Sequence, residues 1–414
     1  MALAEIFERI VGDGAGIRFT AYDGSSAGSP DAEVTLELRS PVALQYIVTA
    51  PGDLGLARAF VSGHLAVHGD VYRALYGLVQ YSRQDVPWSE RIELLRGLGT
   101  GVLRRPPVPP EEAPHPWRRG RRHSKDRDAA AIAHHYDVSN RFYEVVLGPS
   151  MAYTCAVYPT LEASLENAQA EKFDLVCRKL GLQPGMQLLD VGCGWGGMVR
   201  HAAQHYGVQA LGVTLSRQQA EWAQKAIADD GLTGQAEVRF SDYRDVTEAN
   251  FDAVSSIGLT EHIGQKNLPA YFSFLASRLR PGGRLLNHTI TRPTNMERAR
   301  AGGFLDRYIF PDGELEGPGY IQSAMNDHGF EVRHQENLRE HYAMTLRDWG
   351  ANLVAGWDDA VAEVGLRKAR VWQLYMAASR VGFDTNRIQL HQILGVRLGN
   401  DHRSGMPLRP DWGA

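Results

Sequence analysis

From about residue 129 onward, short apolar runs alternate with longer amphipathic segments. The apolar runs predict buried strands at 186–191, 208–213, 251–257 and 283–289. The amphipathic segments predict helices at 165–180, 198–206, 217–230 and 268–279. Strands that alternate with helices are typical of a parallel, doubly wound sheet. We therefore expect an α/β domain of Rossmann-like order over residues 129–414.

Residues 1–103 follow a different pattern. Apolar and polar residues alternate over 34–38, which predicts a half-exposed strand, and the preceding segment 23–30 is rich in turn residues. Helical patterns follow at 54–64 and 71–81. This segment predicts a smaller α+β domain in which no motif carries chemistry.

Residues 104–128 have the composition of a linker. Four prolines stand within 104–110 and prevent a helix there. The stretch 117–127 is basic, and residues 104–128 hold eight Lys or Arg against four Asp or Glu, a local charge of +4. Two interpretations stay open: a solvated linker, or a contact with an anionic lipid surface, where each basic residue adds ~1 kcal/mol.

The composition of the 414 residues excludes several classes of protein. The net charge of −4 gives no support to nucleic-acid binding, and no apolar run approaches the ~20 residues of a membrane helix. Glu5 and Glu8 stand where a secretory signal would carry basic residues. Cys155, Cys177 and Cys193 contain no CxxC pair, so we expect no disulfide framework, no metal site and a cytoplasmic location.

A glycine-rich loop lies between the first expected strand and its helix. Gly192, Gly194 and Gly196 allow tight turns and a close backbone approach to a ligand, and Asp190 precedes them at the strand end. The spacing differs from the dinucleotide fingerprint G-x-G-x-x-G, and the internal acid favours a ligand with a cationic end. The loop resembles that of S-adenosylmethionine-dependent methyltransferases. The alternative is a merely tight turn, and Cys193 is expected only to pack.

Two further segments are candidates for binding a nucleoside. Thr214 and Gln219 follow the second strand, where an acid often binds ribose, although Ser216 and Gln219 also form a capping box at a helix start. Asp242 and Tyr243 follow a third strand, where they could hydrogen-bond to and stack on an adenine. The alternative for this second pair is a simple turn.

Several motifs occur together in one order along the chain. They are His135–Asn140, Met151–Ala156, Asp190–Gly197, Gly212–Ser216, Asp242–Asp245, Glu261–Gly264, His288–Ile290 and Tyr308–Gly313. Over roughly residues 129–400 they resemble the cyclopropane-fatty-acid synthase and mycolic-acid methyltransferase family. The preceding domain resembles the N-terminal extension of the phospholipid-acting bacterial members. The resemblance implies a class I S-adenosylmethionine methyltransferase fold.

The resemblance also implies an activity and a set of site residues. Family members transfer a methyl group from S-adenosylmethionine to a cis double bond in an acyl chain of a membrane phospholipid, and a bound bicarbonate serves as base. Carried over by motif, the bicarbonate ligands are Cys155, Glu261, His288, the backbone of Ile290, and Tyr342. Tyr153 and Thr154 would contact the cofactor. In the alternative interpretation, Cys155 is only a small buried apolar residue, and His288 is a core histidine whose hydrogen bonds are made within the protein.

The implied chemistry passes through a carbocation, which needs an apolar, water-free site. Candidates to soften its charge are Tyr143, Tyr308, Phe310 and Trp349, and most of these are expected to be packing residues. Without bicarbonate, Glu261 itself would be the base. His262, its neighbour, is assigned no chemistry.

Two residues depart from the family pattern. Thr260 stands where many members have an aromatic residue, and Ser379 where relatives often have cysteine, which speaks against a covalent thiol mechanism. The product is expected to be a cyclopropane or, slightly favoured, an exo-methylene, as in the actinobacterial route to 10-methylstearoyl (tuberculostearic) lipids. That route would add a flavin- or NADPH-dependent reductase as a partner.

We therefore expect a lipid-modifying enzyme, peripheral at the cytoplasmic face of the inner membrane, with an unsaturated phospholipid as its partner. Oligomeric state is left open, a homo-oligomer included. One alternative is a methyltransferase of an O or N nucleophile on a soluble metabolite. The other is a non-catalytic protein that binds the cofactor or lipid.

Overall fold

The computed structural model describes residues 1–82, 97–113, 138–295, 303–310 and 313–413. The chain divides into two compact units. Unit 1 comprises Met1–Arg118, Ala301–Pro311 and Trp357–Val381, and unit 2 comprises Arg119–Arg300, Asp312–Gly356 and Gly382–Ala414. The basic stretch 117–127 and the first half of the His135–Asn140 motif lie outside the described residues.

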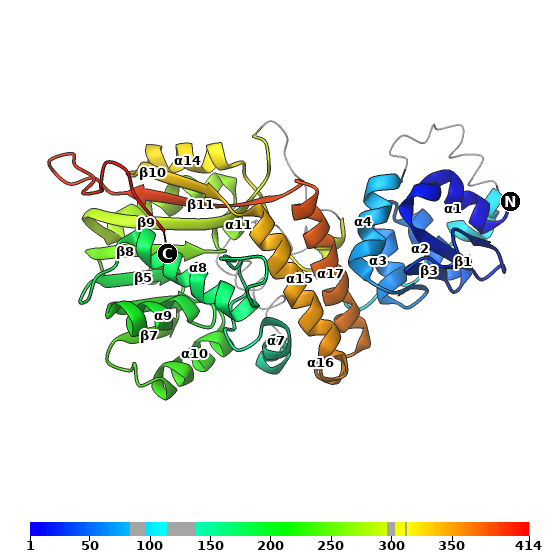
Figure 1. The fold of residues 1–414 in the computed structure, drawn as a ribbon, viewed down its shortest axis with the longest axis horizontal. Helices are drawn as coiled ribbons and strands as arrows, with labels where there is room; N and C mark the ends of the chain where they lie inside the picture. Colours follow the sequence, from blue (N-terminus) through cyan, green and yellow to red (C-terminus); the bar gives the residue numbers. More distant parts are fainter. Residues whose placement is uncertain (83–96, 114–137, 296–302, 311–312, 414) are drawn as a thin grey trace. The chain divides into compact units, whose positions relative to one another are not determined.

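Unit 2 is built on a seven-stranded sheet of order β10-β11-β9-β8-β5-β6-β7 (Figure 1). Five of its strands are parallel: β5 (Gln187–Val191), β6 (Gln209–Thr214), β7 (Ala236–Phe240), β8 (Phe251–Ile257) and β9 (Leu279–Thr291). The four strands expected from the apolar runs are β5, β6, β8 and β9. The class I methyltransferase fold is thereby confirmed.

The sheet also differs from the expected parallel arrangement, because two further strands extend it in the antiparallel sense. β11 (Gln389–Val396) pairs antiparallel with β9, and β10 (Glu331–Asn337) pairs antiparallel with β11. β10 is a half-exposed edge strand of mostly polar residues. It therefore lacks the apolar run that reveals a buried parallel strand.

Helices cover both faces of this sheet. α8 (Leu165–Leu180), α9 (Gly197–Tyr206) and α10 (Arg217–Asp229) pack their apolar faces into one core, whose members include Val176, Val199 and Ala223. On the other face, α12 (Leu268–Arg278) and α14 (Pro318–Asp327) contribute Phe272 and Met325 to a second core. The remaining α-helices in the described part of this unit are α7 (Asn140–Leu147), α11 (Thr260–Ile263) and α15 (Arg339–Ala355).

The strand order reverses at the neighbouring strands β5 and β8. From β5 the chain runs outward through β6 to β7, and it then returns to β8 on the other side of β5. In open α/β sheets such a switch point leaves a crevice at the carboxyl ends of the strands, where ligands bind. The glycine-rich loop follows β5, and the segment that contains Glu261 follows β8.

Unit 1 contains a four-stranded sheet of order β2-β1-β3-β4. Its strands are β1 (Ile17–Ala21), β2 (Ser26–Ala27), β3 (Val34–Leu38) and β4 (Leu65–His68). Its helices include α1 (Leu3–Val11), α2 (Pro41–Thr49), α3 (Asp53–Val61) and α4 (Val71–Tyr81). Burial alternates along β3 as expected from its sequence, so that Val34, Leu36 and Leu38 face the core. The smaller α+β domain is confirmed.

Unit 1 also takes in segments from the second half of the chain: α13 (Gly303–Tyr308), α16 (Trp357–Val364) and most of α17 (Leu366–Asp384). The Asp53 carboxylate at the start of α3 accepts the backbone N–H groups of Gly303 and Phe304 at 3.1 and 3.2 Å. This division differs from the expected unbroken methyltransferase domain over 129–414, because the contacts of these segments are made with the N-terminal elements. Among the described helices, none combines the length and apolarity needed to cross a membrane.

Four short 3₁₀ helices complete the described structure. They are η1 (Asp13–Ala15), η2 (Thr100–Leu103), η4 (Tyr243–Asp245) and η5 (Gln265–Asn267).

Candidate active site

The glycine-rich loop adopts a conformation that requires its glycines. Gly192, Gly194 and Gly196 have φ angles of 75°, 54° and 75°, in the left-handed region that other residues rarely adopt. The loop packs closely against the next strand, because a Cβ added at Gly212 would lie 2.8 Å from the Cys193 sulfur. Cys193 belongs to the core, as expected.

Asp190 lies at the end of β5 and is only 2% exposed. Its carboxylate accepts a hydrogen bond from the Ser255 hydroxyl at 2.6 Å. Burial raises the pKa of Asp190 to about 6, although the Ser255 hydrogen bond and the charge of Lys172 oppose that shift. Asp190 is thus a buried carboxyl group at the point where the glycine-rich loop begins.

The two nucleoside-binding candidates have contacts inside the protein. The Thr214 hydroxyl donates to the Gln219 side-chain oxygen at 2.8 Å, and the backbone N–H of Gln219 donates to the Ser216 hydroxyl, which confirms the helix cap. Asp242 accepts from the backbone N–H and from the guanidinium of Arg244 at 2.6–2.9 Å. The roles of Thr214, Gln219, Asp242 and Tyr243 toward a cofactor stay predictions.

Gly258, which follows β8, brings together three of the predicted residues. Its backbone N–H donates to the His288 carbonyl at 2.8 Å. A Cβ added to it would lie 3.0 Å from the Thr154 methyl group and 4.0 Å from a carboxylate oxygen of Glu261. The next residue, Leu259, packs against Gly192 of the loop. Thr154, Glu261 and the backbone of His288 therefore lie near the glycine-rich loop at the switch point of the sheet.

Glu261 is held against the end of β9. Its carboxylate accepts a hydrogen bond from the Thr289 hydroxyl at 2.7 Å. Burial raises the pKa of Glu261, while hydrogen bonds from Thr289 and the Ile290 backbone oppose the shift. Thr260, the departure from the family pattern, is buried and donates to the Asn287 side-chain oxygen at 2.5 Å. A carboxylate with a raised pKa is suited to accept a proton.

His288 is 1% exposed and only one of its ring nitrogens is paired. Nδ1 lies 3.2 Å from the side-chain nitrogen of Gln392, whereas Nε2 is buried without a hydrogen-bond partner among the described residues. Burial and the charges of Lys172 and Lys179 hold the pKa of His288 well below its usual range, so the ring is neutral. A buried polar atom without a partner costs free energy and indicates a missing ligand.

Cys155 packs against helix α15, which carries Tyr342. The chain around Cys155 runs along this helix, where the Ala156 N–H donates to the Thr345 hydroxyl at 3.0 Å. Cys155 is fully buried, and burial raises the pKa of its thiol, so it stays protonated. The Tyr342 ring lies 6.1 Å from that of Trp349, and Tyr153 lies 5.3 Å from the same ring.

Five aromatic side chains of unit 2 form a cluster. They are Tyr143, Tyr153, Trp195, Tyr342 and Trp349. Trp195 of the glycine-rich loop donates to Asn140 at 2.9 Å, which ties the His135–Asn140 motif to the loop. Tyr143 and Trp349, two of the candidates for softening a cation, belong to this cluster, and that role stays a prediction. Tyr308, Phe310 and Ser379 belong to unit 1.

Sequence reasoning missed Lys172. Its ammonium group is fully buried, donates to the Thr154 hydroxyl at 2.9 Å and lies 3.6 Å from the centre of the Phe173 ring. Burial lowers the pKa of Lys172 to about 7. A signal was present, because Gln169, Lys172 and Lys179 share the helical spacing of the buried face of α8. Long polar residues on such a face indicate a role in a buried polar site.

Comparison with known proteins identifies the family. The family model of mycolic acid cyclopropane synthetase matches residues 123–393. A Mycobacterium tuberculosis protein named "Probable fatty acid methyltransferase Rv3720" is 57% identical over 422 residues, covering 100% of this chain and 98% of its own. The cyclopropane-fatty-acyl-phospholipid synthase of Escherichia coli K12 is 34% identical over 66% of this chain and 69% of its own.

A solved structure agrees with these matches. The cyclopropane synthase MmaA2 of M. tuberculosis superposes with a TM-score of 0.62 at 31% identity, covering 66% of this chain and 99% of that chain. The chain therefore belongs to the mycolic acid cyclopropane synthetase family, and it is an S-adenosylmethionine-dependent methyltransferase.

Proposed function

We propose that this protein transfers a methyl group from S-adenosylmethionine to the cis double bond of an unsaturated acyl chain in a phospholipid. One observation carries the proposal: Gly258 packs against Thr154, the neighbour of the protonated Cys155, bonds to the backbone of His288, and lies near the Glu261 carboxylate. The next residue, Leu259, packs against Gly192 of the glycine-rich loop. An O- or N-methyltransferase has a substrate with its own lone pair and needs no such enclosed set. The names of the relatives, which act on fatty acyl chains, support the same substrate class.

The proposed methyl transfer begins at the double bond of the acyl chain. The π electrons of the alkene form a bond to the methyl carbon, the carbon–sulfur bond breaks, and its electron pair leaves on sulfur. The positive charge moves to the adjacent chain carbon, where aromatic faces such as Tyr143 and Trp349 can soften it by ~0.5–2 kcal/mol each. A proton must then leave the former methyl group. Water must be excluded, because it would capture the cation as an alcohol.

The residues fit the small oxyanion that the family resemblance implies. Such an ion needs donors, and the protonated thiol of Cys155, the Nε2 atom of His288 and the hydroxyl of Tyr342 can supply them. Glu261 orients the assembly and is the base when no ion is bound. A bound bicarbonate would accept the departing proton. Cys155 and His288 are neutral donors, so neither of them adds positive charge near the sulfonium or the cation.

The fate of the cation sets the product. Direct ring closure with loss of a methyl proton gives a cyclopropane, whereas a prior hydride shift followed by the same loss gives an exo-methylene. We propose the methylene product, because the polar Thr260 stands at the position where many members have an aromatic residue. A separate flavin- or NADPH-dependent reductase would then consume that product.

The test uses methyl-labelled S-adenosylmethionine and vesicles of dioleoyl phosphatidylglycerol. We expect label in the acyl chains, which gain one carbon and two hydrogens. Proton NMR of the released fatty acid distinguishes vinylidene protons from cyclopropane protons, which are isomeric products of equal mass. Label found only in water-soluble products, or no transfer from freshly purified protein, would overturn the proposal. Cyclopropane protons would overturn the methylene branch alone.

A further inference from the structure

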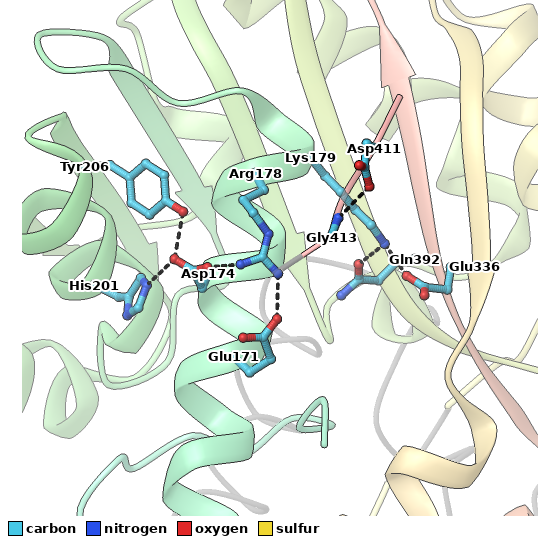
Figure 2. A network of polar contacts seen from close by, with 10 residues as sticks. All are labelled: Glu171, Asp174, Arg178, Lys179, His201, Tyr206, Glu336, Gln392, Asp411 and Gly413. Atoms are coloured by element: carbon cyan, nitrogen blue, oxygen red, sulfur yellow. Dashed lines mark hydrogen bonds and ion pairs between the residues drawn. The ribbon is translucent and has the colours of Figure 1, made fainter. Parts of the chain in front are cut away.

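A polar row, buried at His288 and Gln392 and partly exposed at Glu336, crosses three neighbouring strands. Glu336 of β10 is the register partner of Gln392 on β11, and Gln392 is the register partner of His288 on β9. Directly opposed residues of antiparallel strands project from the same face of the sheet. Lys179 of α8 reaches this row from above (Figure 2).

Lys179 contacts two members of the row. Its side chain is fully buried, and its ammonium group donates to the Gln392 side-chain oxygen at 2.6 Å and pairs with the Glu336 carboxylate. Burial lowers the pKa of Lys179, and the ion pair with Glu336 opposes that shift and favours the charged form. Figure 2 shows Lys179 pointing between these two partners.

These contacts determine which way the Gln392 amide faces. An ammonium group has three donors and no acceptor, so only the amide oxygen can face Lys179. The amide nitrogen then faces His288, 3.2 Å from Nδ1. An amide nitrogen can only donate, so Nδ1 of His288 must carry the lone pair. In a neutral imidazole, the single ring proton then resides on Nε2.

We propose that Gln392 is a positioning residue that holds His288 as the tautomer with its proton on Nε2, and that Lys179 locks the Gln392 amide in the orientation this requires. The effect of this tautomer on catalysis rests on the proposed function. Nε2 is buried and has no hydrogen-bond partner in the described part of the chain, so the row presents a neutral N–H donor to the site. The opposite tautomer would present a lone pair and repel an oxyanion.

The test uses the nearly isosteric variant Gln392→Glu, which reverses the direction of the hydrogen bond between residue 392 and Nδ1 of His288. The new carboxylate can still accept from Lys179, but it offers His288 an acceptor and draws the proton to Nδ1. Gln389→Glu is the matched control, because it adds the same charge to the same strand at a residue that pairs with Asn386. Gln392→Met removes the donor without adding charge and replaces Gln392→Glu if that variant does not fold.

The first readout is the tautomer of His288 in the protein without substrate, from ¹⁵N–¹H correlations of labelled histidine rings assigned with His288→Gln. We expect the proton on Nε2 in the wild-type protein and in Gln389→Glu, and on Nδ1 in Gln392→Glu. In Gln392→Met we expect a mixture of the two. A wild-type proton on Nδ1, or an unchanged tautomer in both Gln392 variants, would overturn the inference.

The second readout is methyl transfer to dioleoyl phosphatidylglycerol. We expect kcat to fall about 10–100-fold in Gln392→Glu, as for other residues that orient a ligand, with the KM for S-adenosylmethionine within about twofold of wild type. A changed tautomer with unchanged kcat would overturn the positioning role. Absence of transfer by the wild-type protein would instead overturn the proposed function, while the tautomer result would stand.

Discussion

At the scale of single residues, the site combines groups whose ionisation depends on burial. Glu261 has a raised pKa, His288 a lowered one, and the Cys155 thiol stays protonated. Each shift has desolvation as its largest cause, since a charge loses more hydration energy than its neighbours return. These different environments separate the roles: Glu261 can accept a proton, whereas Cys155 and His288 keep theirs and can donate hydrogen bonds.

Glu261 provides the first residue-scale prediction. Glu261→Gln keeps an oxygen that can accept from Thr289 but removes the negative charge and the basic oxygen. We expect turnover to fall ~1,000-fold, with the Kd for S-adenosylmethionine within about twofold of wild type. His262→Gln is the neighbouring control and should retain activity. Near-normal turnover of Glu261→Gln would contradict its place in the base assembly.

Lys172 provides a prediction about pH and stability. Its pKa is lowered to about 7 in the folded protein, so between pH ~7 and ~10 the unfolded chain binds more protons and stability rises with pH. We expect denaturant titrations to show this rise reduced by ~3 kcal/mol in Lys172→Met, because no buried ammonium is left to neutralise. Lys225→Met, an exposed lysine on α10, should leave the rise intact. An equal rise in Lys172→Met and wild type would contradict the assignment.

At the scale of elements, the position of the glycine-rich loop depends on its packing against β6. A Cβ at Gly212 would lie 2.8 Å from both the Cys193 sulfur and the Val199 side chain. These neighbours belong to the loop and to α9, so any relief must move the segment that approaches the ligand. The position of the loop is therefore a property of the strand, loop and helix together.

We predict that Gly212→Ala destabilises the protein by ~1–3 kcal/mol and weakens S-adenosylmethionine binding, because overpacking displaces the loop. Denaturant titration and calorimetric binding measure the two effects. Gly234→Ala is the matched control: its Cβ would meet no atom within 4 Å, and its φ is not positive. A Gly212→Ala protein with wild-type stability and affinity would contradict this account of the loop.

At the scale of the whole molecule, chain segments that are far apart in sequence build each unit. In unit 1 the buried carboxylate of Glu112 accepts hydrogen bonds from Arg58 of α3 at 2.7 and 2.8 Å. It also pairs with Arg307 of α13 at 2.7 Å. The hydrogen bond that Arg58 donates to Glu112 raises the pKa of Arg58. The ion-paired group thus joins three distant segments of the sequence.

We predict that Glu112→Ala destabilises the protein by ~3–5 kcal/mol, because two partly buried guanidinium groups lose their counter-charge. Thermal and denaturant unfolding measure the loss. Glu33→Ala removes a carboxylate from an exposed pair with Arg73 and should cost at most ~1 kcal/mol. Equal effects of the two variants would contradict the buried role of Glu112.

The charge distribution of the whole chain leads to a further prediction. The net charge is −4, yet residues 104–128 carry a local charge of +4. We expect the protein to bind anionic vesicles with an affinity that falls as salt rises, because ions screen exposed charges over ~10 Å at 0.1 M. Changing Arg118, Arg119, Arg121 and Arg122 to Gln should reduce binding in a co-sedimentation assay. Binding that is insensitive to salt would indicate an apolar contact instead.

The local pattern of apolar and polar residues was sufficient to predict most of the central sheet and its helices. The strands β5, β6, β8 and β9 and the helices between them follow from apolar runs and helical spacing, since the fold buries one face of each helix and both faces of each inner strand. The cap at Ser216 and the turn conformation of the glycine-rich loop also follow from local chemistry. The motif order predicted the family.

The features that depend on distant partners follow from the three-dimensional fold. The edge strand β10, the inclusion of α13 and α16 in unit 1, and the ion-paired group around Glu112 arise from contacts between segments that are far apart in the sequence. The role of Lys172 and the row from Glu336 to His288 also depend on which polar groups meet after burial. A sequence reports the period and hydrophobicity of a segment, whereas hydrogen-bond direction and pKa depend on neighbours that only the fold brings within reach.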